Sequence, residues 1–271
     1  MDVSQAQLET ELFRILRAHG YGQQYVDRFR MITTFYHEKI SLVVIICGTI
    51  CAGKSLVATK LAERLNLPHV LQTDLVAHLI RMSANSPLAK VPSWCDPAPG
   101  VVCHDHKDKF LREFRRECSA VRKSVEGDLG KAIKEGKSII LEGLYQDLGT
   151  YLHDFRPQKG PADSESRDPA ERPSSPSSAA SGLPAPGAPV VVPIILAMPP
   201  EQRNRRVGEW TELNHARLCA GGDGEGAKAR LLERARGCMA VLQEYLERNY
   251  GGQVKTCVVD DPGDPQCIEE V

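Results

Sequence analysis

The sequence predicts an α/β fold, in which a parallel sheet of five strands lies between two layers of helices and a helical extension precedes it. Two observations carry this prediction. Apolar runs of strand length alternate with segments of helical periodicity from Leu42 onward, and such alternation requires right-handed crossovers that place helices on both faces of a parallel sheet. The first apolar run also leads directly into a glycine-rich turn and a helix. A chain of 271 residues is long enough for one such domain with appendages.

The expected elements follow from the spacing of the apolar residues. We expect strands at 42–47, 69–74, 137–145, 190–198 and 254–261. We expect helices at 54–66, 75–82, 107–135, 201–218 and 227–249, where apolar residues recur at helical spacing. Residues 1–39 carry leucines and aromatic residues at the same spacing and should form two or three further helices.

Residues 156–189 interrupt this alternation. Proline, serine, alanine and charged residues dominate the stretch, which has almost no apolar side chains to bury. We therefore expect a disordered insert in the crossover after the third strand, where extra loop length costs little free energy. The insert interrupts one domain and does not separate two.

The strand at 42–47 leads into the sequence GTICAGKS, which fits the pattern GxxxxGK[ST] of a phosphate-binding P-loop. The pattern covers Gly48, Thr49, Ile50, Cys51, Ala52, Gly53, Lys54 and Ser55. Its two glycines allow successive backbone N–H groups to converge on phosphate oxygens. Lys54 is expected to neutralise the β- and γ-phosphates, and the Ser55 hydroxyl to be a ligand of Mg²⁺. The sequence thus predicts that this segment binds ATP with Mg²⁺.

Two carboxylates stand at the ends of other expected strands. Asp74 ends the segment HVLQTD, and Glu142 follows SIIL. In a doubly wound sheet the ligand crevice opens at the carboxyl ends of the strands. Asp74 could there orient a hydroxyl or take its proton, and Glu142 could hold Mg²⁺ through water or fix the acceptor. Alternatively, each is a helix-cap or turn carboxylate.

Composition argues against several classes of function. The net charge is −1, with acidic and basic residues mixed throughout, so we expect no nucleic-acid or membrane surface. No apolar run approaches the roughly twenty residues of a membrane span, and the first twenty residues lack a signal core. Nine scattered cysteines indicate reduced thiols in a cytoplasmic protein. Cys95, Cys103, His104 and His106 could ligate zinc, but their spacing matches no standard site.

Three longer segments, at 42–76, 110–143 and 191–198, closely resemble a known family. That family comprises the eukaryotic P-loop NTPases related to archaeal 2-phosphoglycerate kinase, among them the plant low-phytic-acid proteins. Two positions depart from its pattern. Tyr145 stands where the family usually has a histidine, and Leu56 where it commonly has a threonine.

The resemblance implies an ATP-dependent small-molecule kinase. By analogy, its acceptor is a small phosphorylated hydroxy acid or a molecule linked to inositol-phosphate metabolism. The resemblance also implies a kinase-like P-loop domain over residues 40–271, which follows the N-terminal helical extension over 1–39. The rival interpretation is a nucleotide-binding regulatory protein without efficient catalysis.

Three arginines stand close together just after the fourth expected strand. Arg203, Arg205 and Arg206 lie near the start of the expected helix 201–218, in a region that forms a mobile lid in kinases of this fold. Guanidinium groups form two-point contacts with phosphate, so we expect these arginines to help bind the acceptor. The alternative is a solvated helix face whose charge is balanced by neighbouring glutamates.

Overall fold

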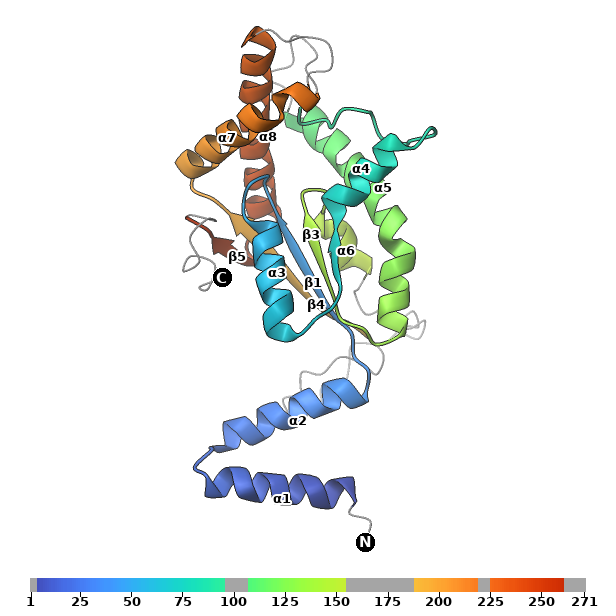
Figure 1. Cartoon of the computed structure of the whole chain (residues 1–271), viewed down its shortest axis with the longest axis vertical. Coiled ribbons are helices and arrows are strands. Elements are labelled where there is room, and N and C mark those ends of the chain that lie inside the picture. The colour runs from blue at the N-terminus through green and yellow to red at the C-terminus, as the bar shows by residue number, and fades with distance from the viewer. Residues whose placement is uncertain (1–3, 96–106, 155–187, 219–224, 261–271) are drawn as a thin grey trace, which may run out of the picture.

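The computed structural model describes residues 4–95, 107–154, 188–218 and 225–260 (Figure 1). Its strands are β1 (Leu42–Gly48), β2 (Val70–Gln72), β3 (Ile139–Gly143), β4 (Val190–Ala197) and β5 (Lys255–Val258). Its helices are α1 (Gln5–Ala18), α2 (Gln23–His37), α3 (Lys54–Leu65), α4 (Thr73–Met82), α5 (Lys107–Lys134), α6 (Leu148–Asp154), α7 (Pro200–Leu218) and α8 (Glu225–Tyr250). The strands form one parallel sheet in the order β2-β3-β1-β4-β5. The predicted fold class is therefore confirmed.

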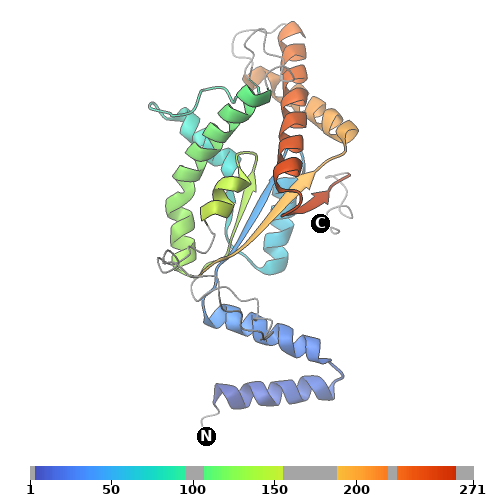
Figure 2. The same ribbon diagram turned by 180° about the vertical axis from the view of Figure 1, so that it is seen from behind.

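The central strand β1 explains why the sheet lies between two layers. Successive side chains of a strand point to opposite faces, and β1 is apolar at every position from Leu42 to Cys47. Val43, Ile45 and Cys47 belong to the core on the face covered by α5 and α8, whereas Val44 and Ile46 belong to the core beneath α3. Views from opposite sides show α3 on one face and α5 and α8 on the other (Figures 1 and 2).

The first two helices lie beyond the end of the sheet where β1 begins, opposite the end where its P-loop lies (Figures 1 and 2). They contact each other through Phe13 and Phe29, whose ring centroids are 5.7 Å apart. The division into an extension and a kinase-like domain at residue 40 stays a prediction. The predicted insert at 156–189 falls almost wholly outside the described residues.

The structure differs from the sequence-based expectation in two local features. The segment HVLQTD was expected to be strand to its end, but β2 stops at Gln72 and α4 begins at Thr73. The buried Thr73 hydroxyl donates to the Glu142 carbonyl oxygen over 3.1 Å, so the start of α4 is attached to the end of β3. Helix α6 was not predicted, because seven residues are too few for a clear helical period.

Every helix in the described ranges is too short or too polar to span a bilayer.

Candidate active site

The predicted P-loop connects β1 to α3 by a tight turn. β1 ends at Gly48, and α3 begins at Lys54. Within the turn, Cys51 and Gly53 have φ angles of 63° and 80°, in the left-handed region that lets neighbouring N–H groups face one concave side. The N-terminal end of α3 adds the positive end of its dipole at the same place. The backbone therefore has the form that a polyphosphate needs.

Lys54 is held inside this turn. Its side chain is buried, and its ammonium donates to the Thr49 carbonyl oxygen over 2.7 Å. The hydrogen bond fixes the cation at the mouth of the loop, where it also lines the cavity described below. A positioned ammonium here can neutralise phosphate oxygens without first being reoriented.

The two cysteines near the P-loop behave as packing residues. Burial raises the pKa of the Cys47 thiol to about 12, against the opposing effect of the Lys54 charge. Burial also raises the pKa of Cys51. Thiolates are the reactive form of cysteine, so both thiols stay protonated and unreactive near neutral pH. This supports packing over a redox role.

Ser55 and Glu142 meet next to the P-loop. The Ser55 hydroxyl donates to Glu142 Oε1 over 2.8 Å, and Glu142 Oε2 is buried with no hydrogen-bond partner among the described residues. The pKa of Glu142 is raised, because the effect of burial outweighs the lowering effects of its bond with Ser55 and of the charge of Lys54. A hydroxyl and a carboxylate are oxygen ligands of the kind that Mg²⁺ prefers. The buried Oε2 of Glu142 has a lone pair available for a cation. Ser55 and Glu142 are therefore suitable ligands for the Mg²⁺ that a kinase would bind.

Asp74 approaches the same place from the first turn of α4. Its Oδ1 accepts a hydrogen bond from the Leu144 backbone N–H over 2.7 Å, just after β3. The carboxylate is therefore fixed by another element and does not cap its own helix, whose N-cap is Gln72. This arrangement needs a close approach of α4 to Gly143. A Cβ there would overlap Thr73 Oγ1 and lie 3.0 Å from Asp74 Oδ1.

We expect Gly143→Ala to destabilise the protein by about 2 kcal/mol, because the new methyl group collides with α4 and the φ of 145° disfavours alanine. Thermal unfolding would measure the loss. The matched control is Gly127→Ala within α5, where a Cβ meets nothing within 4 Å; alanine there should stabilise the helix by up to about 1 kcal/mol. Equal unfolding temperatures for the two variants would contradict the packing described here.

A cavity of about 820 Å³ lies between the P-loop and α4, and residues of both line it. Lys54 and Ser55 line it from the P-loop side, and Asp74 lines it from α4. Helix α7 forms a further wall. The charged lining residues, apart from His78, are Lys54, Arg81, Lys90, Arg206, Asp74 and Glu209. Basic groups exceed carboxylates, which favours anionic ligands.

The side of the cavity near Asp74 holds a network that sequence reasoning missed. Tyr145 is buried, and its hydroxyl accepts from Trp94 Nε1 over 3.2 Å. The Arg81 guanidinium lies 4.8 Å from the Tyr145 ring centroid and pairs with Glu117 over 2.9 Å. Burial raises the pKa of Tyr145 above its usual range, so its hydroxyl stays protonated. Tyr145, which stands where the family resembled in sequence usually has a histidine, thus forms part of the cavity wall.

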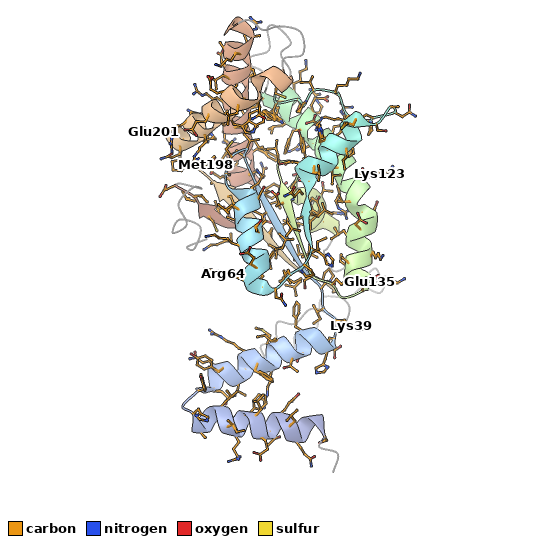
Figure 3. The ribbon with its side chains drawn as sticks, in the orientation of Figure 1. Lys39, Arg64, Lys123, Glu135, Met198 and Glu201 are labelled. Carbon is orange, nitrogen blue, oxygen red and sulfur yellow. The ribbon has the colours of Figure 1, made fainter. Side chains whose placement is uncertain are left out.

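The structure separates the three arginines of α7, a helix whose first turn contains Glu201 and which follows Met198 (Figure 3). Arg206 lines the cavity. Arg203 is buried and donates to Gln243 Oε1 of α8 over 3.1 Å. Arg205 is exposed, donates to Gln202, and lies 3.6 Å from Glu209, as expected for a solvated helix face. Of the three, Arg206 is therefore the one placed to meet a ligand in this cavity.

The structure does not test the zinc alternative, because three of its four candidate ligands lie outside the described residues. Cys95 is buried, but Cys103, His104 and His106 lie outside the described residues. No group of three metal-ligating side chains occurs within the described ranges.

Comparisons with known proteins give distant relatives. The chain is 31% identical over 146 residues to a 2-phosphoglycerate kinase of Methanocaldococcus jannaschii, covering 53% of this chain and 46% of that one. It is 25% identical over 159 residues to a 2-phosphoglycerate kinase of Pyrococcus furiosus, covering 56% and 51%. The chain spans about half the length of the curated relatives it matches. No model of a known family matches it.

A proposed kinase from Chloroflexus aurantiacus, of known crystal structure, aligns with a TM-score of 0.43 at 12% identity, covering 85% of this chain and 94% of that one. A likeness at that level says nothing about function. The sequence matches show a distant relationship to archaeal 2-phosphoglycerate kinases, which favours kinase activity. Neither relative is named for inositol phosphates.

Proposed function

We propose that this protein is an ATP-dependent kinase that transfers the γ-phosphate to a hydroxyl of a small molecule already bearing phosphate. One observation carries the proposal. A single cavity is lined by Lys54 and Ser55 of the P-loop and also by Asp74, so a phosphate donor and an acceptor hydroxyl can meet inside it. Phosphoryl transfer depends mainly on such positioning and on neutralising charge.

The nucleotide side is assigned to the P-loop. Its backbone N–H groups and the N-terminal end of α3 would bind the phosphates, and Lys54 would neutralise charge on the β- and γ-phosphates. Ser55 and Glu142 would hold Mg²⁺, directly or through water, because their oxygens already meet at 2.8 Å. When bound, Mg²⁺ neutralises negative charge on the phosphate oxygens.

The acceptor side is assigned to Asp74. The Leu144 N–H engages Oδ1, so Oδ2 is the oxygen left to orient the acceptor hydroxyl and take its proton. The carboxylate lines the cavity from α4 and not from the P-loop itself, so we assign it to the nucleophile rather than to the phosphate cradle. Glu142 is too deeply buried for the same task.

The acceptor class follows from the charge of the cavity and from the relatives. The excess of basic lining residues favours a molecule that is itself anionic, and the relatives are named for 2-phosphoglycerate. We therefore propose a small phosphorylated hydroxy acid. The resemblance to plant low-phytic-acid proteins makes inositol phosphates the second class to test.

The test measures transfer of labelled γ-phosphate from ATP to 2-phosphoglycerate and to inositol monophosphate. Glycerate and inositol are the matched acceptors without phosphate. The proposal expects transfer to a phosphorylated member of one pair and much less to its partner. ATP binding without transfer to any acceptor would favour the rival function, a regulatory protein without efficient catalysis.

We expect the three arginines of α7 to differ in that assay. Arg206→Gln should raise the acceptor KM about tenfold, because a cavity-lining guanidinium is lost. Arg205→Gln should change KM less than about twofold, since its partners are exposed on the same helix. Arg203→Gln should mainly lower the unfolding temperature by breaking its bond to Gln243. Similar KM values for all three variants would contradict this division.

A further inference from the structure

We propose that Arg81 and Lys90 form the subsite that binds the phosphate group of the acceptor. This inference rests on the proposed kinase function and deepens it, because it assigns the phosphate group of the acceptor to α4 and the segment after it, alongside Arg206 of α7. The ligand class is a phosphate monoester that carries a hydroxyl within a few bonds of its phosphate.

Arg81 has a fixed side chain. It leaves the last turn of α4, and its guanidinium is 4.8 Å from the Tyr145 ring centroid. Its Nη2 donates to Glu117 Oε1 over 2.9 Å, and only 7% and 3% of the two side chains are exposed. A buried ion pair beside an aromatic ring leaves the guanidinium little rotational freedom. The group is therefore preorganised at the cavity wall.

The pair with Glu117 does not use all of the donors of Arg81. A guanidinium has five N–H groups, and Arg81 Nε is buried without a hydrogen-bond partner among the described residues. Glu117, in contrast, also accepts from the Ser93 N–H and hydroxyl over 3.2 and 2.9 Å. Leaving a buried donor unpaired is costly. Arg81 lines the cavity, and its pair with Glu117 uses Nη2 alone, so other N–H groups of the guanidinium are left for an anionic ligand.

Lys90 provides the net charge. Because Arg81 and Glu117 cancel each other, the pair alone has little attraction for an anion. Lys90 is exposed and lines the same cavity. It forms no ion pair within the part of the chain that the structure describes, so its ammonium adds positive charge there. A rigid two-point donor beside a mobile cation is well suited to a phosphate dianion.

The spacing along α4 limits the size of the acceptor. Asp74, His78 and Arg81 all line the cavity and are separated by four and three residues, which places them on one face of the helix. The helix rises about 10 Å from Asp74 to Arg81, and the side chains of both residues line the cavity between these two positions. A molecule of three to six carbons can therefore contact Asp74 with its hydroxyl and Arg81 with its phosphate.

The chain has a built-in reporter of binding. Its two tryptophans, Trp94 and Trp210, both line the cavity with ring centroids 5.3 Å apart. Intrinsic fluorescence of the full chain can follow titration with 2-phosphoglycerate and inositol monophosphate, each beside its phosphate-free partner, glycerate or inositol. The wild type should bind a phosphorylated probe clearly more tightly than its partner.

Two variants test the subsite. Lys90→Gln and Arg81→Lys should each weaken binding of the phosphorylated probe about tenfold, with affinity for ATP unchanged. Arg81→Lys keeps the charge opposite Glu117, so the variant retains its ion pair while losing the planar donor geometry. The matched control is Lys123→Gln, at an exposed site on α5 (Figure 3), which should bind both ligands as the wild type does.

The outcomes separate this inference from the function on which it rests. If the wild type binds and phosphorylates a probe but both variants bind it equally well, the subsite is wrong and the kinase function stands. If both variants also lose affinity for ATP, the residues have a general structural role and the inference fails. If the wild type binds neither ATP nor any phosphorylated probe, the proposed function fails together with the subsite.

Discussion

Lys54→Ala is expected to lower kcat at least about a hundredfold to thousandfold, the size of loss seen when one preorganised charge-stabilising donor is removed. The ammonium is buried and held by the Thr49 carbonyl oxygen at 2.7 Å, and a water molecule in the vacated space would bring no positive charge to the phosphates. ATP affinity should fall as well, because the same cation contributes to ground-state binding.

The fold should survive this change. Removing Lys54 loses its bond to the Thr49 carbonyl oxygen, whereas Glu142 Oε1 keeps its bond from Ser55. Circular dichroism and thermal unfolding would check this, with Lys131→Ala at an exposed site of α5 as the matched control. Turnover and ATP affinity equal to the wild type would show that the P-loop is not the nucleotide site.

Local patterns in the sequence predicted the sheet well. Strands β1, β3 and β4 coincide with mostly apolar runs, whereas β2 and β5 are short and partly polar. The P-loop pattern follows β1 directly in the sequence. Glu142 was found for the same reason, because a carboxylate at the end of a buried strand interrupts an apolar pattern. These signals lie within short segments, so the sequence of a single chain is sufficient to identify them.

The remainder of the candidate site depends on contacts distant in sequence. Glu117 lies 36 residues from Arg81 in the chain, and nothing in either segment indicates that they meet. Trp94 and Tyr145 are likewise 51 residues apart. The start of α4 was misplaced because its Thr73 is fixed by β3. Spacing within a segment cannot reveal such partners, which is why Arg81 and Lys90 were missed.

Asp74→Asn is expected to lower kcat by about a hundredfold to ten-thousandfold, the usual contribution of a general base. An amide is nearly the same shape as the carboxylate, and its oxygen can still accept from the Leu144 N–H. The variant therefore keeps the position of the side chain and loses the ability to take a proton. Affinity for ATP should stay within about twofold of the wild type, because the carboxylate serves the acceptor and not the phosphate cradle.

Titration calorimetry with ATP, run beside turnover measurements at saturating substrates, separates these two effects. Asp128→Asn, an exposed carboxylate of α5, is the matched control and should leave both quantities unchanged. Loss of ATP affinity with an unchanged kcat would instead assign Asp74 to the nucleotide. Glu142 could not then serve as the base in place of Asp74, since its Oε1 already accepts from Ser55 and the residue is 2% exposed. The acceptor proton would then leave through another group, such as a phosphate oxygen of the nucleotide, and kcat would not depend on the Asp74 carboxylate.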